Sequence, residues 1–295
     1  MIVTLENALV TAKIDTVGAQ LISLKDGGGT EYIWQRDPEV WKNCSPVLFP
    51  IVGNLRDGKT VIDGKECAIE KHGPCKSLEF DLLLADQATA VFELTWEKFP
   101  EGGYPYRFAL RLKYRLVGKN LTVSMEVENR DEGDIWYCCG FHTGFRCPLG
   151  ELERFEDYYL EFPEEQEHGY RRYDLEKLEF DRSKEYPFPG QDGRRIPLSR
   201  ELFVHDAFWF DRPRSKRVSL KSRAGEKGVE VDFRDFDTVA FWTMTSEKAE
   251  FLCIEPWNGS AVCSDEDGEF IHKNHIRKLE KGKTEVCSMT ISLLS

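Results

Sequence analysis

The sequence predicts an all-β protein of antiparallel sheets with little helix. Apolar and polar residues alternate with a period of two over several short segments, which is the pattern of strands with one buried face and one solvent-exposed face. Glycine-containing turn sequences separate these segments, and no long amphipathic helical pattern appears. Aromatic residues, which favour strands, make up 12% of the chain.

The clearest alternation lies between residues 106 and 127. Apolar side chains occupy every second position of Tyr106–Leu116, and most of the intervening residues are arginine or lysine. The same alternation resumes over Leu121–Val127, after the turn sequence Gly118-Lys119-Asn120. We therefore expect two antiparallel strands joined as a hairpin.

Further strands are expected where the alternation recurs, at Phe92-Leu94-Trp96, Val229-Val231-Phe233 and Cys287-Met289-Ile291-Leu293. We expect at most a short helix, near Glu151–Asp157. Many strands without crossover helices indicate a sandwich or a barrel.

The 295 residues contain no Pro/Ser-rich linker and no internal repeat, so we expect a single domain, 1–295. The segment Phe162–Leu198 is rich in charge, proline and glycine, and we expect a long excursion on the surface there.

The composition argues against several classes of partner. A formal charge of −12 repels phosphate backbones and anionic lipids, so neither nucleic-acid nor membrane binding is expected. Arg171-Arg172 and Arg194-Arg195 are the candidates for a local basic patch, although such pairs are usually solvated loop charges. No segment approaches the roughly 20 apolar residues of a membrane span, and the N-terminal residues lack the pattern of a signal peptide.

Nine cysteines without a framework spacing or a C-x-x-C pair suggest buried free thiols in a reducing cytoplasm. No metal site is expected: on a strand His272 and His275 would point to opposite faces, and the acidic run after Ser264 lacks the rest of a calcium loop. Neither a phosphate-binding loop nor a dinucleotide fingerprint appears.

Three segments place ionisable groups among apolar residues. Glu255, between Ile254 and Trp257, would be partly desolvated, which raises a carboxyl pKa toward the range useful for proton transfer. His142 lies in a glycine-containing aromatic segment and can act as an acid or as a base, although a hydrogen-bonded core histidine is the default interpretation of that segment alone. The segment around His72, taken alone, is only weak evidence for a functional site.

Taken together and in order, these segments resemble the aldose 1-epimerase family, and most closely its LacX-like branch of galactose mutarotase homologues. The resemblance covers almost the whole chain. It rests on Ser45–Gly53, His72-Gly73, Tyr104–Phe108, Gly140–Phe145, Asp206–Phe208 and Ile254–Trp257.

The resemblance implies a β-supersandwich fold and an isomerase that needs no cofactor. Glu255 would remove the proton of the anomeric hydroxyl while His142 protonates the ring oxygen, and closure of the opened sugar gives the other anomer. His72 would hydrogen-bond near the reacting oxygen. Sugar-binding residues would be Arg56, Asp206, Lys76 and Trp257, with Phe208 or Trp209 as further candidates for an apolar platform.

The chain departs from the family pattern at His72-Gly-Pro-Cys-Lys76, where the family often has an arginine in place of the lysine, and at Thr143, where a proline is common. These changes bear on the choice of sugar. Three functions stay open: a mutarotase for a free aldohexose, a mutarotase for a hexose 6-phosphate, and a non-catalytic carbohydrate-binding paralogue. A monomer and a homodimer are equally compatible with the sequence.

Overall fold

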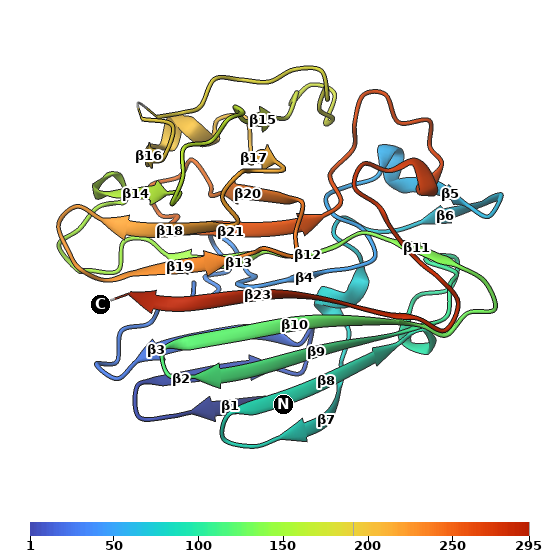
Figure 1. Ribbon diagram of the computed structural model, residues 1–295, viewed down its shortest axis with the longest axis horizontal. Coiled ribbons are helices and arrows are strands. Elements are labelled where there is room, and N and C mark those ends of the chain that lie inside the picture. Colours follow the sequence, from blue (N-terminus) through green and yellow to red (C-terminus); the bar gives the residue numbers. More distant parts are fainter. Residues whose placement is uncertain (191, 295) are drawn as a thin grey trace.

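The computed structural model describes residues 1–190 and 192–294, and it is built almost entirely of antiparallel strands. Two large sheets dominate (Figure 1). The larger has nine strands in the order β16 (Arg195–Pro197), β14 (Tyr158–Glu161), β18 (Arg217–Ser222), β19 (Gly228–Asp232), β23 (Thr284–Leu294), β10 (Asn120–Asn129), β9 (Phe108–Val117), β8 (Thr89–Thr95) and β7 (Asp81–Ala85).

The second large sheet carries the candidate site. Its order is β15 (Arg171–Arg172), β17 (Phe208–Asp211), β20 (Thr238–Trp242), β21 (Phe251–Asn258), β12 (Cys139–Phe141) and β4 (Val47–Leu48), with β13 (Thr143–Arg146) also paired to β21. Three small sheets complete the fold: β1 (Ile2–Glu6), β2 (Val10–Asp15) and β3 (Gln20–Asp26); β5 (Lys59–Ile62) and β6 (Lys65–Ala68); β11 (Ile135–Tyr137) and β22 (Arg277–Leu279).

The expected hairpin is present as β9 and β10, in which Val117 pairs with Asn120 across the turn. The alternating apolar residues of both strands are buried, as are those of β19 and β23. Trp96 differs from expectation, because β8 ends at Thr95 and the chain turns there.

Helical structure in the described residues is limited to short 3₁₀ turns: η1 (Arg56–Gly58), η2 (Pro74–Ser77), η3 (Trp96–Lys98), η4 (Phe155–Asp157), η5 (Arg200–Phe203) and η6 (Phe270–His272). The short helix suggested for Glu151–Asp157 corresponds to η4. No helix in the described part of the chain has the length and apolar character needed to cross a bilayer.

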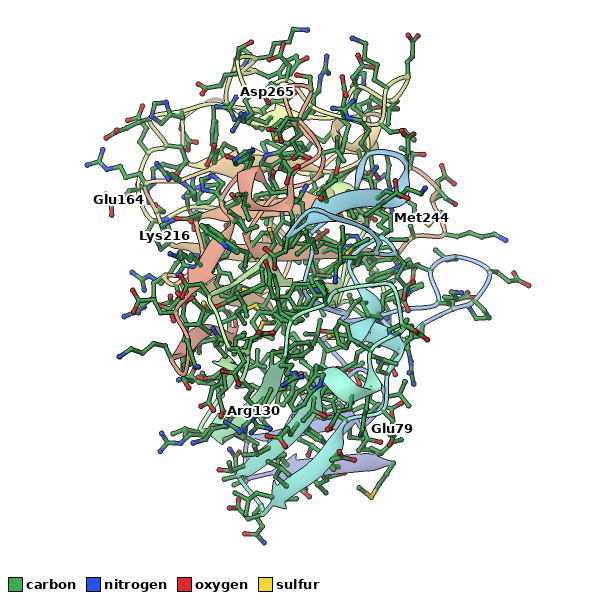
Figure 2. The ribbon with its side chains drawn as sticks, turned by 90° about the vertical axis from the view of Figure 1, so that its right-hand side faces the viewer. Glu79, Arg130, Glu164, Lys216, Met244 and Asp265 are labelled. Atoms are coloured by element: carbon green, nitrogen blue, oxygen red, sulfur yellow. The ribbon has the colours of Figure 1, made fainter. Side chains whose placement is uncertain are left out.

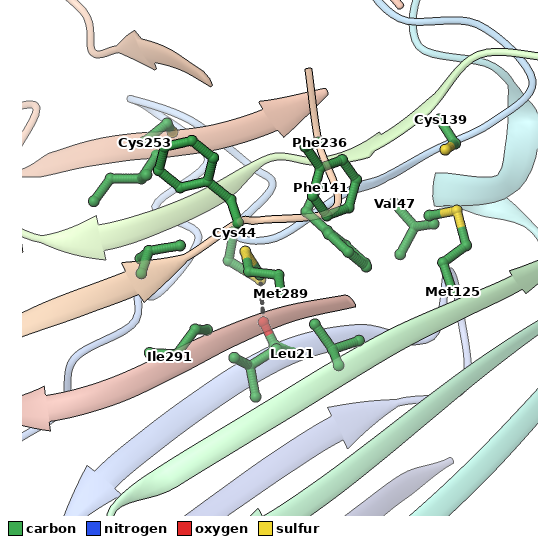
Figure 3. Packing of buried hydrophobic residues seen from close by; sticks show 14 of the residues in the cluster. Leu21, Cys44, Val47, Met125, Cys139, Phe141, Phe236, Cys253, Met289 and Ile291 are labelled. Carbon is green, nitrogen blue, oxygen red and sulfur yellow. Dashed lines mark hydrogen bonds between the residues drawn. The ribbon is translucent and has the colours of Figure 1, made fainter. Parts of the chain in front are cut away.

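The core fills the space between the sheets and draws residues from both of them, including Met125 and Met289 from the larger and Phe141 from the second (Figure 3). All nine cysteines are buried free thiols, as expected. Charged side chains such as Glu164 and Asp265 lie on the outside (Figure 2). The all-β sandwich prediction is therefore confirmed.

Candidate active site

A cavity of about 290 Å³ opens beside the second sheet. Its walls come from the segments before and after β4, the loop after β6, strands β20 and β21, the junction of β12 and β13, the loop before β17 and the Phe162–Leu198 excursion. The lining residues are Trp41, Asn43, Pro46, Gly53, Glu70, Lys71, His72, Lys76, His142, Tyr173, Asp206, Ala207, Trp242, Glu255 and Trp257.

Strand register brings His142 and Glu255 together. Residue 140 pairs with residue 257, and residue 143 with residue 254, in one unbroken antiparallel register. His142 therefore falls opposite Glu255, where side chains share a face of the sheet. The His142 Nε2 atom lies 3.3 Å from Glu255 Oε2. The predicted acid and base thus face each other across one cavity.

Burial pushes both groups of this pair toward their uncharged forms. Desolvation raises the pKa of Glu255 well above its usual value, and the nearby Asp206 carboxylate acts in the same direction while Lys71 opposes it. Desolvation, helped by Lys71, lowers the pKa of His142 to about 3. Near neutral pH the pair therefore holds a single proton, which the two groups can share.

Three buried polar atoms at the site lack a hydrogen-bond partner: His142 Nδ1, Glu255 Oε1 and Trp257 Nε1. Leaving a buried polar group unpaired costs about 1–3 kcal/mol. Such groups are expected where a polar ligand completes the hydrogen bonding.

His72 sits on a tightly folded loop beside the pair. The Gly53 N–H donates to His72 Nδ1 at 3.1 Å, which leaves the proton of the neutral ring on Nε2. Its ring stands edge-on to that of His142, with centroids 5.4 Å apart. Burial, and secondarily His142, lowers the pKa of His72 well below its usual value. The ring is therefore a neutral N–H donor.

Lys76 lines the cavity, but its ammonium group is occupied by the protein. It donates to the carbonyl oxygens of Lys71 and Gly73, each at 2.8 Å, and pairs with Glu70 at 2.9 Å. Since an ammonium group has three N–H donors, these contacts use all of them. Lys76 therefore holds the His72 loop closed.

Two further residues singled out from the sequence, Asp206 and Trp257, also line the cavity. The Trp242 indole N–H donates to Asp206 Oδ1 at 2.7 Å, so the second carboxylate oxygen can accept from a ligand. Trp257 lines the cavity, whereas Phe208 and Trp209 are buried elsewhere.

Arg56 is the predicted site residue that the structure places outside this cavity. Its guanidinium donates to Glu179 at 2.8 Å and to the Cys263 carbonyl at 2.9 Å. It lines an adjoining cavity of about 500 Å³ that shares Glu70 and Lys71 with the first.

The lining residues that sequence reasoning missed include Trp41, Lys71, Tyr173 and Trp242. The rings of Trp41 and Trp242 pack against His142 at centroid distances of 5.2 and 5.6 Å. Lys71 could have been suspected, because it directly precedes His72. Tyr173 belongs to the charged excursion, and nothing in that pattern indicates that one of its side chains turns inward.

The two histidines near the C-terminus have separate partners. His272 Nδ1 lies 2.7 Å from Asp267, and His275 Nε2 lies 2.6 Å from Asp211. Neither lines the candidate active site.

Comparison with known proteins identifies the family to which this fold and this site belong. The family model for aldose 1-epimerase matches residues 1–276, and the chain belongs to that family. It is 34% identical to Protein LacX of Lactococcus lactis subsp. lactis over an alignment of 301 residues that covers all of both chains.

Solved structures agree with this assignment. A galactose mutarotase related enzyme from Lactobacillus acidophilus superposes with a TM-score of 0.92 at 29% identity, covering 100% of this chain and 98% of the other. A galactose mutarotase-like protein from Lactobacillus casei gives a TM-score of 0.91 at 24% identity, covering 99% and 100%. The β-supersandwich and the LacX-like branch, both inferred from the sequence, are confirmed.

Proposed function

We propose that this protein is an aldose 1-epimerase that interconverts the anomers of an unphosphorylated aldohexose. The observation that carries the proposal is the 3.3 Å approach of His142 to Glu255 on the wall of an open cavity. Ring opening of a hemiacetal needs one proton to leave the anomeric oxygen while another arrives at the ring oxygen. An acid and a base in one cavity perform both transfers without a full charge developing.

Binding of the sugar would prepare the pair for this reaction. The unpartnered Glu255 Oε1 can accept a hydrogen bond from a sugar hydroxyl, and such bonds favour the carboxylate form. The shared proton then moves to His142. Glu255 takes the proton of the anomeric hydroxyl, His142 gives its proton to the ring oxygen, and the bond from the anomeric carbon to the ring oxygen breaks to give the aldehyde.

Rotation about the bond between the first two carbons and ring closure complete the cycle. The same transfers run backwards, so the pair returns to its starting protonation state and no cofactor is consumed. His72 would donate its Nε2–H near the reacting oxygen, and Asp206 would accept from a sugar hydroxyl. Trp257 would provide an apolar surface and an indole N–H. Arg56 would reach only a part of the substrate that extends into the adjoining cavity.

The surroundings of the cavity favour an uncharged sugar over a hexose 6-phosphate. Neither arginine pair supplies a cation to the cavity: Arg171 donates to the Lys184 carbonyl at 2.8 Å, and Arg195 pairs with Glu161 at 2.7 Å. Among the described lining residues, the ammonium groups of Lys71 and Lys76 are matched by the carboxylates of Glu70 and Asp206, and no arginine is present. The cavity therefore offers a phosphate no excess positive charge to offset its own charge.

The test is polarimetry on freshly dissolved α-D-galactose and α-D-glucose, alongside the corresponding 6-phosphates at equal concentration. We expect faster equilibration of the free sugars and a loss of at least about 100-fold in Glu255→Gln. The matched control is Glu179→Gln, because Glu179 pairs with Arg56 away from the His142–Glu255 pair.

An unchanged rate in Glu255→Gln would refute the assigned roles. Tight sugar binding by calorimetry without any acceleration would instead identify a non-catalytic carbohydrate-binding protein.

A further inference from the structure

A buried thiol lies directly beside the proposed acid–base pair. One ligand atom from each of His142, Cys253 and Glu255 lies within 4.8 Å of the other two, and all three residues are buried. Cys253 and Glu255 are two positions apart on β21, so their side chains share one face of the strand. The proposed reaction gives Cys253 no task.

The local packing leaves room for this thiol. Gly144 pairs with Cys253 in the register of β13 and β21. A Cβ atom built on Gly144 would lie 3.5 Å from the sulfur and only 2.7 Å from the Trp41 ring, so a side chain there would crowd the cluster. Cys253 is fully buried and belongs to the hydrophobic core cluster drawn in Figure 3. Within the described residues, its thiol has no hydrogen bond.

We propose that His142, Cys253 and Glu255 form an inhibitory binding site for Zn²⁺. An imidazole nitrogen, a thiolate and a carboxylate are ligands that zinc takes in tetrahedral sites. Zinc–ligand bonds of about 2.0–2.3 Å place neighbouring ligand atoms roughly 3.3–3.6 Å apart. The observed 3.3 Å between His142 Nε2 and Glu255 Oε2 already matches such an edge.

The charges of the ligands balance the charge of the ion, and the site can provide four zinc ligands. The thiolate of Cys253 and the carboxylate of Glu255 neutralise the two charges of the ion, and both the thiol proton and the proton shared by His142 and Glu255 pass to solvent. Glu255 Oε1, which has no partner, remains beside the coordinated oxygen. The cavity side would supply a water molecule as the fourth ligand.

A bound zinc ion would stop the proposed reaction, because it occupies the atoms that exchange protons with the sugar. This half of the inference rests on the proposed function, whereas zinc binding does not. Mg²⁺ prefers an octahedral shell of oxygen ligands and should not compete.

The test uses Co²⁺ as a spectroscopic probe for zinc on the full-length chain. We expect one Co²⁺ per chain with a thiolate-to-metal charge-transfer absorption that Zn²⁺ removes. Cys253→Ala should lose this absorption. Cys44→Ala is the matched control, since Cys44 is equally buried but donates to the Leu21 carbonyl outside the cluster.

Polarimetry then tests inhibition. Zn²⁺ should abolish the acceleration in the wild-type protein, and a chelator should restore it. In Cys253→Ala, which keeps the acid–base pair, half-inhibition should need at least about tenfold more zinc, equivalent to a loss of about 1.4 kcal/mol in binding.

Absence of the absorption in the wild-type protein, its persistence in Cys253→Ala, or equal zinc sensitivity of the two proteins would each overturn the proposal, as would zinc binding at Cys253 without inhibition. A wild-type protein without mutarotase activity would refute the proposed function, while the Co²⁺ absorption would still decide the metal site.

Discussion

The indole N–H of Trp242 donates to Oδ1 of Asp206 at 2.7 Å. Asp206 lies in a short loop and has a backbone φ of 65°, in the left-handed region. The strand-borne Trp242 therefore fixes the orientation of a carboxylate whose own backbone segment is irregular. Trp242 also packs against His142, so one side chain connects the proposed sugar-binding group with the proposed acid.

Trp242→Phe should weaken sugar binding more than it slows the chemistry. The phenyl ring keeps the packing on His142, but the N–H bond to Asp206 is lost. A hydrogen bond to a charged group contributes about 1.5–3 kcal/mol, so we expect KM to rise roughly 10- to 100-fold with little change in kcat. Polarimetric kinetics measure both constants. Trp136→Phe, at a site away from the cavity, should leave both unchanged, and an equal fall of kcat in Trp242→Phe would contradict this role.

His142→Asn should remove the acid while preserving the fold. General acid catalysis is worth about 10²- to 10⁴-fold, and we expect kcat to fall within that range. Thermal unfolding followed by circular dichroism should show a similar Tm, because the new side chain is also polar and smaller. His272→Asn provides the control, since His272 is exposed and pairs with Asp267. Retention of full activity in His142→Asn would exclude it as the acid.

Gly73→Ala should destabilise the protein and displace His72. Gly73 has φ = 75°, and a Cβ atom there would lie 1.9 Å from the Phe49 carbonyl oxygen. Gly102 offers a matched control, because its φ is 77° and a Cβ atom added there would meet no other atom within 4 Å.

We expect Gly102→Ala to cost about 1–2 kcal/mol from its backbone conformation alone. Gly73→Ala should cost more and also lower kcat, because the steric clash moves the loop that carries His72. Denaturant unfolding measures the first effect and polarimetry the second. Equal losses of stability in the two variants would show that the contact with Phe49 is unimportant.

As the pH is lowered, the mutarotase activity should fall only well below the ordinary pKa of a histidine. A histidine with an ordinary pKa near 6.5 would give the pair a second proton in mildly acidic solution. Because burial lowers the pKa of His142 to about 3, the pair keeps its single proton, and kcat/KM should stay constant from about pH 7 to about pH 5. On the alkaline side, activity should fall only where the raised pKa of Glu255 allows the last proton to leave.

Lys71→Met tests the electrostatic part of this profile. The positive charge of Lys71 lowers the pKa of His142 and opposes the rise in the pKa of Glu255. Its removal should move both limbs to higher pH. Lys98→Met, which removes a lysine paired with Asp81 away from the cavity, should leave the profile unchanged. A wild-type acidic limb near pH 6.5 would contradict the neutral, buried state of His142.

Much of the fold was predictable because strand patterning is local. In β9 and β10 each residue's face follows from the period of two, and the Gly118-Lys119-Asn120 turn sets their pairing. Glu255, His142, His72 and Asp206, which line the cavity, were also singled out from the sequence, because their segments resemble a known family in the same order. The excursion Phe162–Leu198 was recognised as irregular, but its contribution of Tyr173 to the cavity was not.

Only the tertiary structure decided how these side chains meet. The approach of His142 to Glu255 depends on the register of β12 and β13 against β21, and a shift of one residue would turn one of them to the other face. Three-dimensional packing likewise places the Lys76 ammonium group against backbone carbonyls, holds Arg56 against Glu179, and brings Cys253 close to the proposed acid–base pair. Alternation along the chain is a property of neighbouring residues, so the sequence determined the strands and the chemical groups available. Distances between groups on different strands arise from long-range pairing, which no local pattern encodes.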